Sequence, residues 1–128
     1  MPNETVIAEG APAPSGPYSP AILATGTRVL TISGQIADGA DGVVGGDDAG
    51  EQARECLRKL DALLQAAGAS KADVVKVTIF LTDMADRAAV AQARVEYFGE
   101  HKPAATLVEI SALVVPELKV EIEATAIF

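Results

Sequence analysis

The sequence predicts an α+β fold in which two helices cover one face of a β-sheet. The last ten residues, 119–128, alternate between apolar and polar side chains, which is typical of a half-buried strand. Two other segments, 48–68 and 83–99, carry apolar residues at helical spacing. Segments rich in β-branched residues lie between and around them, so the predicted order is strands, helix, strand, helix, strand, strand.

Composition restricts the classes of partner and compartment. The 128 residues suggest a single domain spanning 1–128, with a core of Ala, Val, Ile and Leu because 49% of residues are apolar and Trp is absent. A formal net charge of −8 argues against nucleic-acid or membrane partners. One cysteine excludes an internal disulfide and a cysteine-cluster metal site. No secretion signal or membrane-spanning run is evident, so the expected location is cytoplasmic.

The N-terminal segment is predicted to present an aromatic side chain in a stiff loop. A short strand at 5–8 precedes a stretch rich in Gly, Pro and Ser at 10–20. Within this stretch, Pro17 and Pro20 bracket Tyr18 and restrict the backbone on both sides of it. Tyr18 either pins the loop to the surface or forms the wall of a pocket.

Two strands, 21–25 and 28–32, are predicted to form a hairpin around the two-residue turn Gly26-Thr27. Gly34, which follows in Ser33-Gly34-Gln35-Ile36, allows a β-bulge or the close approach of another group. The glycine- and aspartate-rich stretch 38–48 matches neither a phosphate loop nor a calcium loop. We interpret it as turns without a metal site.

The first predicted helix begins at Asp48, an N-cap residue with Glu51 at the capping-box position, and ends at Gly68. Its apolar stripe consists of Ala53, Cys56, Leu57, Leu60, Leu63, Leu64 and Ala67. Because Cys56 belongs to this stripe, a buried structural thiol is a better interpretation than a nucleophile. The β-branched segment 74–81 that follows predicts a central strand.

The second predicted helix is capped by Asp83 and has one apolar face made of Met84, Ala88, Ala91, Val95 and Phe98. The single histidine, His101, follows it; an imidazolium is favoured near a helix C-terminus, and catalysis is the alternative role. A strand at 103–110 and a loop at 111–118 lead to the last strand.

The last strand places Glu121 and Glu123 on its polar face, two residues apart. Both carboxylates are either solvated or, beneath a ligand or an apolar cover, available for chemistry. Two helices cover only one face of the sheet, whereas 74–81 is apolar on both faces. A second copy of the chain is the economical cover for the remaining face.

Four motifs together resemble one known family. They are Gly16-Pro17-Tyr18, Ser33-Gly34-Gln35-Ile36, Pro103-Ala104-x-Thr106-x-Val108-Glu109 and Val120-Glu121-Ile122-Glu123-Ala124. In this order and spacing the chain resembles the RidA/YjgF family of enamine/imine deaminases. The resemblance implies a chorismate-mutase-like subunit with ferredoxin-like layering, a mixed sheet and two helices on one face. It also implies a homotrimer whose sheets form a barrel, with a small-molecule cleft at each subunit interface and no cofactor.

The resemblance also implies a set of site residues. Glu121 matches the catalytic glutamate, and Tyr18, Ser33, Gly34 and Gln35 match positions that line the cleft. In the Pro-Ala-Arg-Ser/Thr motif, alanine stands at the arginine position, Ala105, and is followed by Thr106. Leu107, just after the motif, stands where a cysteine is common. The resemblance places all three at the substrate.

The substitution at 105 removes a guanidinium suited to gripping the substrate carboxylate. Arg28, Lys102 and Lys119 are candidates for a replacement cation. Two functions therefore remain open: a hydrolase acting on an imine or enamine, and a non-catalytic small-molecule binder. A ribonuclease-like role is disfavoured by the acidic charge.

Overall fold

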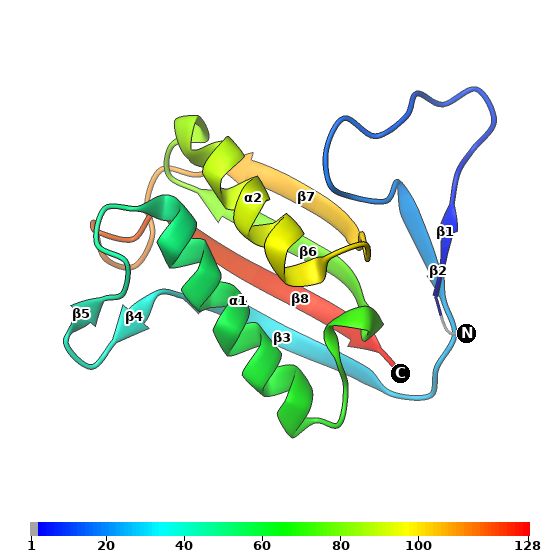
Figure 1. Ribbon diagram of the computed structural model, residues 1–128, viewed down its shortest axis with the longest axis horizontal. Coiled ribbons are helices and arrows are strands. Elements are labelled where there is room, and N and C mark those ends of the chain that lie inside the picture. The colour runs from blue at the N-terminus through cyan, green and yellow to red at the C-terminus, as the bar shows by residue number, and fades with distance from the viewer. Residues whose placement is uncertain (1–2) are drawn as a thin grey trace.

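The computed structural model describes residues 3–128 and has an α+β architecture (Figure 1). The strands are β1 (Asn3–Val6), β2 (Ala21–Ala24), β3 (Val29–Ile36), β4 (Asp38–Gly39), β5 (Gly42–Val43), β6 (Val74–Leu81), β7 (Ala104–Glu109) and β8 (Val120–Ile127), and the helices are α1 (Ala49–Ala66) and α2 (Arg87–Phe98). The main sheet has the order β3-β8-β6-β7, with β6 and β7 parallel and the other pairs antiparallel. Both helices lie on the same face of this mixed sheet, which confirms the predicted fold class.

The last strand occupies the interior of the sheet. β8 lies between β3 and β6, and its residues Val120, Ile122, Ala124 and Ala126 are buried toward the helices. The predicted alternation is therefore confirmed, because neighbouring residues on a strand face opposite sides of the sheet. β6 is also an interior strand, between β8 and β7, as its β-branched composition predicts.

Helix α1 begins as predicted. The carboxylate of Asp48 accepts a hydrogen bond from the backbone N–H of Glu51 at 3.1 Å, and Gly68 lies just beyond the helix with φ of +84°. Leu63 is the exception to the predicted stripe, since it is 42% exposed. The other members of the stripe within α1 are buried.

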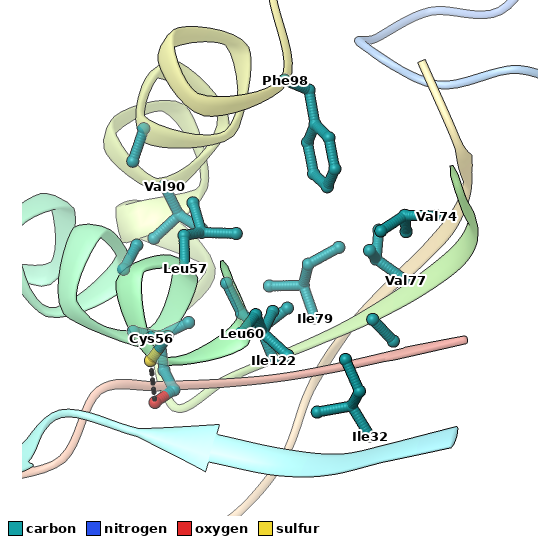
Figure 2. Packing of buried hydrophobic residues seen from close by; sticks show 14 of the residues in the cluster. Ile32, Cys56, Leu57, Leu60, Val74, Val77, Ile79, Val90, Phe98 and Ile122 are labelled. Atoms are coloured by element: carbon teal, nitrogen blue, oxygen red, sulfur yellow. Dashed lines mark hydrogen bonds between the residues drawn. The ribbon is translucent and has the colours of Figure 1, made fainter. Parts of the chain in front are cut away.

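The core is formed between α1, α2 and the inner face of the sheet (Figure 2). Leu57 and Leu60 of α1 face Ile79 of β6 and Ile122 of β8. Cys56 is fully buried, and its thiol lies 3.9 Å from the carbonyl oxygen of Val120. Burial raises the pKa of this thiol to about 12, so Cys56 is the structural thiol that the sequence predicted.

The predicted face of the second helix is wrong. Asp83 caps a 3₁₀ turn, Met84–Asp86, by accepting from the N–H of Ala85, and α2 begins only at Arg87. Of the predicted face only Phe98 is buried, whereas Met84 and Val95 are 39% and 48% exposed. Met84, Ala88 and Ala91 do lie on one side, but this side borders an open cavity and not the core. The buried residues of α2 are Val90, Ala93, Arg94 and Phe98.

The predicted hairpin around Gly26 is also wrong. β2 pairs with β1, whereas β3 pairs with β8. The N–H groups of Thr27 and Arg28 both donate to the carbonyl of Phe128, at 3.1 and 2.9 Å. These bonds hold the connection against the end of β8, and the β1–β2 pair lies apart from the main sheet (Figure 1). The first strand covers Asn3–Val6 in place of the predicted 5–8.

A buried glutamine connects α1 to the start of the last strand. The amide nitrogen of Gln52 donates to the carbonyls of Gly46 and Glu117, at 2.7 and 3.1 Å. Its amide oxygen accepts from the N–H of Lys119 at 2.8 Å. Gln52 therefore fixes the backbone two residues before Glu121.

We expect Gln52→Leu to lower the free energy of unfolding by about 2 kcal/mol, because it leaves the N–H of Lys119 without its partner. Chemical denaturation followed by circular dichroism measures this loss. Gln65→Leu on the exposed side of the same helix is the matched control and should change stability by less than about 0.5 kcal/mol. Equal stabilities of the two variants would contradict the prediction.

Candidate functional site

Three of the predicted site residues line one cleft. Tyr18, Ala105 and Leu107 border an open cavity of about 480 Å³ between the loop at 15–18, helix α2 and strand β7. The loop is fastened to the start of β7, since the N–H of Ser19 donates to the carbonyl of Pro103 at 3.2 Å. The hydroxyl of Ser19 also donates to the carbonyl of Lys102. Tyr18 is thus part of a pocket wall, one of the two roles that the sequence left open.

Ala105 and Leu107 lie on the helix side of the sheet. In the parallel pairing with β6 they stand opposite Val77 and Ile79, which are buried beneath the helices. β7 is the edge strand, so the cleft opens at the rim of the sheet. The cleft is wide there because the side chain at 105 is only a methyl group.

Helix α2 contributes the cations of this cleft. Arg87 and Arg94 both line it, with Ala88 and Ala91 between them. Arg94 is only 5% exposed; one of its terminal nitrogens, Nη2, donates to the carbonyl of Pro17 at a long 3.4 Å, and its Nε has no partner among residues 3–128. Desolvation lowers the pKa of Arg94 below its ordinary value, because burial disfavours the charged form.

Neither arginine was among the site residues predicted from the sequence. The seven-residue interval between Arg87 and Arg94 is two helical turns, so it places them on one side of α2. This spacing is visible in the sequence. Ala88 and Ala91 belong to the predicted apolar face, and the structure shows that they line the cleft beside the arginines.

The predicted catalytic carboxylate lies elsewhere on the chain. Glu121 stands opposite Ile36 and Phe80 in the sheet and borders a shallow pocket of about 370 Å³ with an apolar wall. The ladder between β3 and β8 is irregular between Ile32 and Gln35, as the bulge prediction at Gly34 anticipates. A Cβ atom added to Gly34 would lie 1.8 Å from Oε2 of Glu121, so only glycine accommodates the carboxylate here.

Glu121 faces one side of the sheet, whereas Ala105 and Leu107 face the other. Ile122 is buried on the helix side, so the side chain of Glu121 faces the other side, away from Ala105 and Leu107. Thr106 shares the face of Glu121, and its hydroxyl oxygen accepts from the Nζ of Lys76 at 2.9 Å. One chain therefore does not bring Glu121 and the Tyr18 cleft together.

The other predicted positions take local roles. Gln35 donates through its amide nitrogen to the carbonyl of Ser33 at 2.9 Å. Ser33 lines a third pocket with Lys76 and Glu123 on the face that bears Glu121. His101 is bonded through Nε2 to the carbonyl oxygen of Val74 at 2.7 Å, which connects the end of α2 to the start of β6.

The three cations proposed from the sequence do not line the Tyr18 cleft. The guanidinium of Arg28 lies over the ring of Phe128, 5.1 Å from its centroid. Lys102 borders an adjoining pocket that also contains Glu100. Lys119 lies at the start of β8, where its backbone N–H binds Gln52. Arg87 and Arg94 thus replace them as the cations of the cleft.

Two further structural findings concern broad classes of function. Among residues 3–128, no three His, Cys, Asp or Glu side chains are grouped so that they could hold a metal ion. In the same range, neither helix has the length and apolar character needed to cross a membrane.

Fold and cleft together define a class: small α+β proteins with two helices on one face of a mixed sheet and an open cleft of small-molecule size at its edge. The sequence model of the family described as Endoribonuclease L-PSP matches residues 8–128. A RutC family protein of Pyrococcus horikoshii is 45% identical over 125 residues, which cover 97% of each chain.

A 2-iminobutanoate/2-iminopropanoate deaminase of Salmonella typhimurium is 39% identical over 129 residues and 98% of each chain. A solved structure from Yersinia pestis, a protein of the conserved Rid family, superposes with a TM-score of 0.88 at 36% identity and covers all of both chains. The chain belongs to this family, the RidA/YjgF proteins that its motifs resemble.

Proposed function

We propose that the protein is a cofactor-free deaminase that hydrolyses a reactive imine or enamine of a small molecule. The observation that carries this proposal is the carboxylate of Glu121, which is seated against Gly34 beside an apolar wall. No ion pair to Glu121 exists among residues 3–128. The name of the Salmonella typhimurium relative, an imine deaminase, supports the same class of reaction.

Glu121 acts in this proposal as the acid and base of the hydrolysis. Its carboxylate accepts a proton from a water molecule while the water oxygen attacks the carbon of the C=N bond. The proton then passes to the nitrogen and gives a carbinolamine. Glu121 next takes the proton of the new hydroxyl group and delivers it to the nitrogen, so the C–N bond breaks and ammonia leaves as the C=O bond forms. A carboxylate held at one position suits both transfers, because proton transfer needs contact at hydrogen-bond distance.

The site in this proposal is completed between copies of the chain. Glu121 of one copy faces the cleft of Tyr18 and Ala105 of the next, since the two groups lie on opposite faces of one sheet. Half-buried Phe80 and 38% exposed Val108 lie on the face that the helices leave uncovered. A homotrimer whose sheets meet in the middle covers this face, as the family resemblance implies, and a cytoplasmic location suits such an assembly.

Assembly is expected to appear as a single species of three times the 13.1 kDa chain mass. Sedimentation equilibrium at micromolar concentration measures it directly. A monomer under these conditions would remove the proposed interface site.

The alternative is a binding protein of the same family that does not turn over its ligand. Ala105 favours it, because the family motif has an arginine there. Hydrolysis of 2-iminobutanoate generated in situ separates the two functions: ammonia release faster than the spontaneous rate supports the deaminase, whereas saturable binding without turnover supports the binder. RNA cleavage is disfavoured by the net charge of −8.

A further inference from the structure

The buried charge of Arg94 has no counter-charge within its own chain. A buried guanidinium without a partner is strongly destabilising, because desolvation is not offset by an ion pair. Arg94 has five N–H donors. The structure gives the guanidinium one long bond, to the carbonyl of Pro17, and leaves its Nε unbonded. The fold keeps this destabilising charge, which indicates that the guanidinium of Arg94 serves to bind a ligand.

The arginines of α1 show the contrast. Arg54 pairs with Glu51 and Glu96, at 2.5 and 3.0 Å, and Arg58 pairs with Glu55 at 2.6 Å. These side chains are more exposed than Arg94, yet each has a carboxylate. In a chain with eighteen Asp and Glu and only ten Lys and Arg, the described structure gives Arg94 none.

Arg87 adds a second cation to the same cleft. It lies two turns before Arg94 on α2, and no Asp or Glu among residues 3–128 lines this cleft. The small side chains Ala88, Ala91 and, from β7, Ala105 line the same cleft. The cleft is therefore a positively charged hollow with room for a ligand, in a protein whose net charge is negative.

We propose that Arg94 and Arg87 form an anion subsite that binds the carboxylate of a small organic acid in the Tyr18 cleft. Arg94 donates from the buried side of the cleft and Arg87 from its open rim. The subsite supplies from α2 the cation that the motif lacks at Ala105. The inference rests on the proposed function for the identity of the acid, which is an imino or enamino acid. Binding of the anion by the two arginines does not require that the protein turn over a substrate.

The test uses 2-oxobutanoate, the stable product expected from hydrolysis of 2-iminobutanoate. Calorimetric titration of the intact protein gives its Kd, and the side-chain Nε–H signal of Arg94 in ¹⁵N NMR reports contact. The neutral ketone 2-butanone, which lacks the carboxylate, is the ligand control. We expect saturable binding of the acid, a shifted Nε–H signal, and no comparable binding of the ketone.

Substitutions locate the subsite. We expect Arg94→Met to weaken binding of 2-oxobutanoate on the order of 10- to 100-fold, the range for losing a hydrogen-bonded charge. Arg87→Met should weaken it on the order of 3- to 10-fold, because this side chain is exposed. Arg58→Met removes an exposed, paired arginine on α1 and should leave the Kd unchanged. Without ligand, Arg94→Met should melt at the same or a higher temperature, since it removes an unpaired buried charge.

Any one of several results would overturn the inference. They are an unchanged Kd in both cleft variants, no binding of 2-oxobutanoate by the wild type, or loss of assembly in Arg94→Met, which would mean that Arg94 pairs with a carboxylate of a neighbouring copy. The deaminase proposal fails separately. If the acid binds through Arg94 but no imine is hydrolysed, the deaminase proposal fails and the subsite stands. If Arg94→Met hydrolyses the imine with unchanged kcat/KM, the deaminase proposal stands and the subsite is ruled out.

Discussion

Glu121→Gln is expected to reduce turnover by about 10²- to 10⁴-fold, the contribution of a positioned general acid or base. Glutamine preserves the size of the side chain and its fit beside Gly34 but cannot accept and return a proton. Assembly and melting temperature should therefore remain nearly unchanged. The rate of ammonia release from the imine, measured at saturating substrate, is the readout.

Glu123→Gln is the matched control. Glu123 lies on the same face of β8 but is exposed, in a pocket shared with Lys76 and Ser33. Its substitution should alter stability or assembly more than turnover. Full activity of Glu121→Gln on a substrate that the wild type hydrolyses would disprove the catalytic assignment and favour the binding protein.

A mixing experiment tests whether the site spans two copies. Glu121→Gln and Tyr18→Ala each damage a different half, so mixed trimers contain some sites built from two intact halves. Co-expression in equal amounts should restore about a quarter of wild-type turnover, the fraction of intact sites when copies meet at random across a head-to-tail interface. Activity no higher than the average of the two separate variants would contradict a site shared between two copies.

Gly34→Ala should lower turnover by about 10²-fold, the loss that a displacement of roughly 1 Å can cause at a reacting centre. The added Cβ would overlap Oε2 of Glu121, which is the far end of a flexible side chain. The carboxylate can move aside, so the fold should persist while its position is lost. Steady-state kinetics and a thermal melt, measured on the same preparation, separate the two effects.

A double-variant cycle identifies Gly34 as a positioning residue. If Gly34 acts only through Glu121, Gly34→Ala should have little further effect in the Glu121→Gln background, since the two substitutions share one cause. Additive losses in the double variant would mean that Gly34 contributes in another way, and the positioning role would be wrong.

Much of the fold could be predicted because local signals and tertiary packing agree. The alternation of 119–128 and the β-branched segment 74–81 predicted the two interior strands. Asp48 predicted the start of α1, and the stripe that contains Cys56 predicted its buried face. In each case, the side chains that fit the element are also those that the core buries.

The incorrect predictions occurred where contacts between distant segments decided the structure. The residues near Gly26 do not predict that the N–H groups of Thr27 and Arg28 donate to the carbonyl of Phe128, about a hundred residues away. Helix α2 packs against the core through Val90 and Ala93, so Ala88 and Ala91 line the cleft and Arg94 is buried. The position of the Gly26 turn and the buried face of α2 both depend on contacts between distant segments, which the spacing of apolar residues does not predict.

The sequence by itself determined the element types, the shared face of Glu121 and Glu123, the family motifs and the alanine at position 105. These follow from local spacing, because side chains alternate along a strand and repeat along a helix with fixed periods. Only the tertiary structure decided that Glu121 and Ala105 face opposite sides of the sheet and that Arg94 is buried without a counter-charge. Strand pairing and helix docking join residues far apart in the chain, so the make-up of the cleft was decided by contacts between elements.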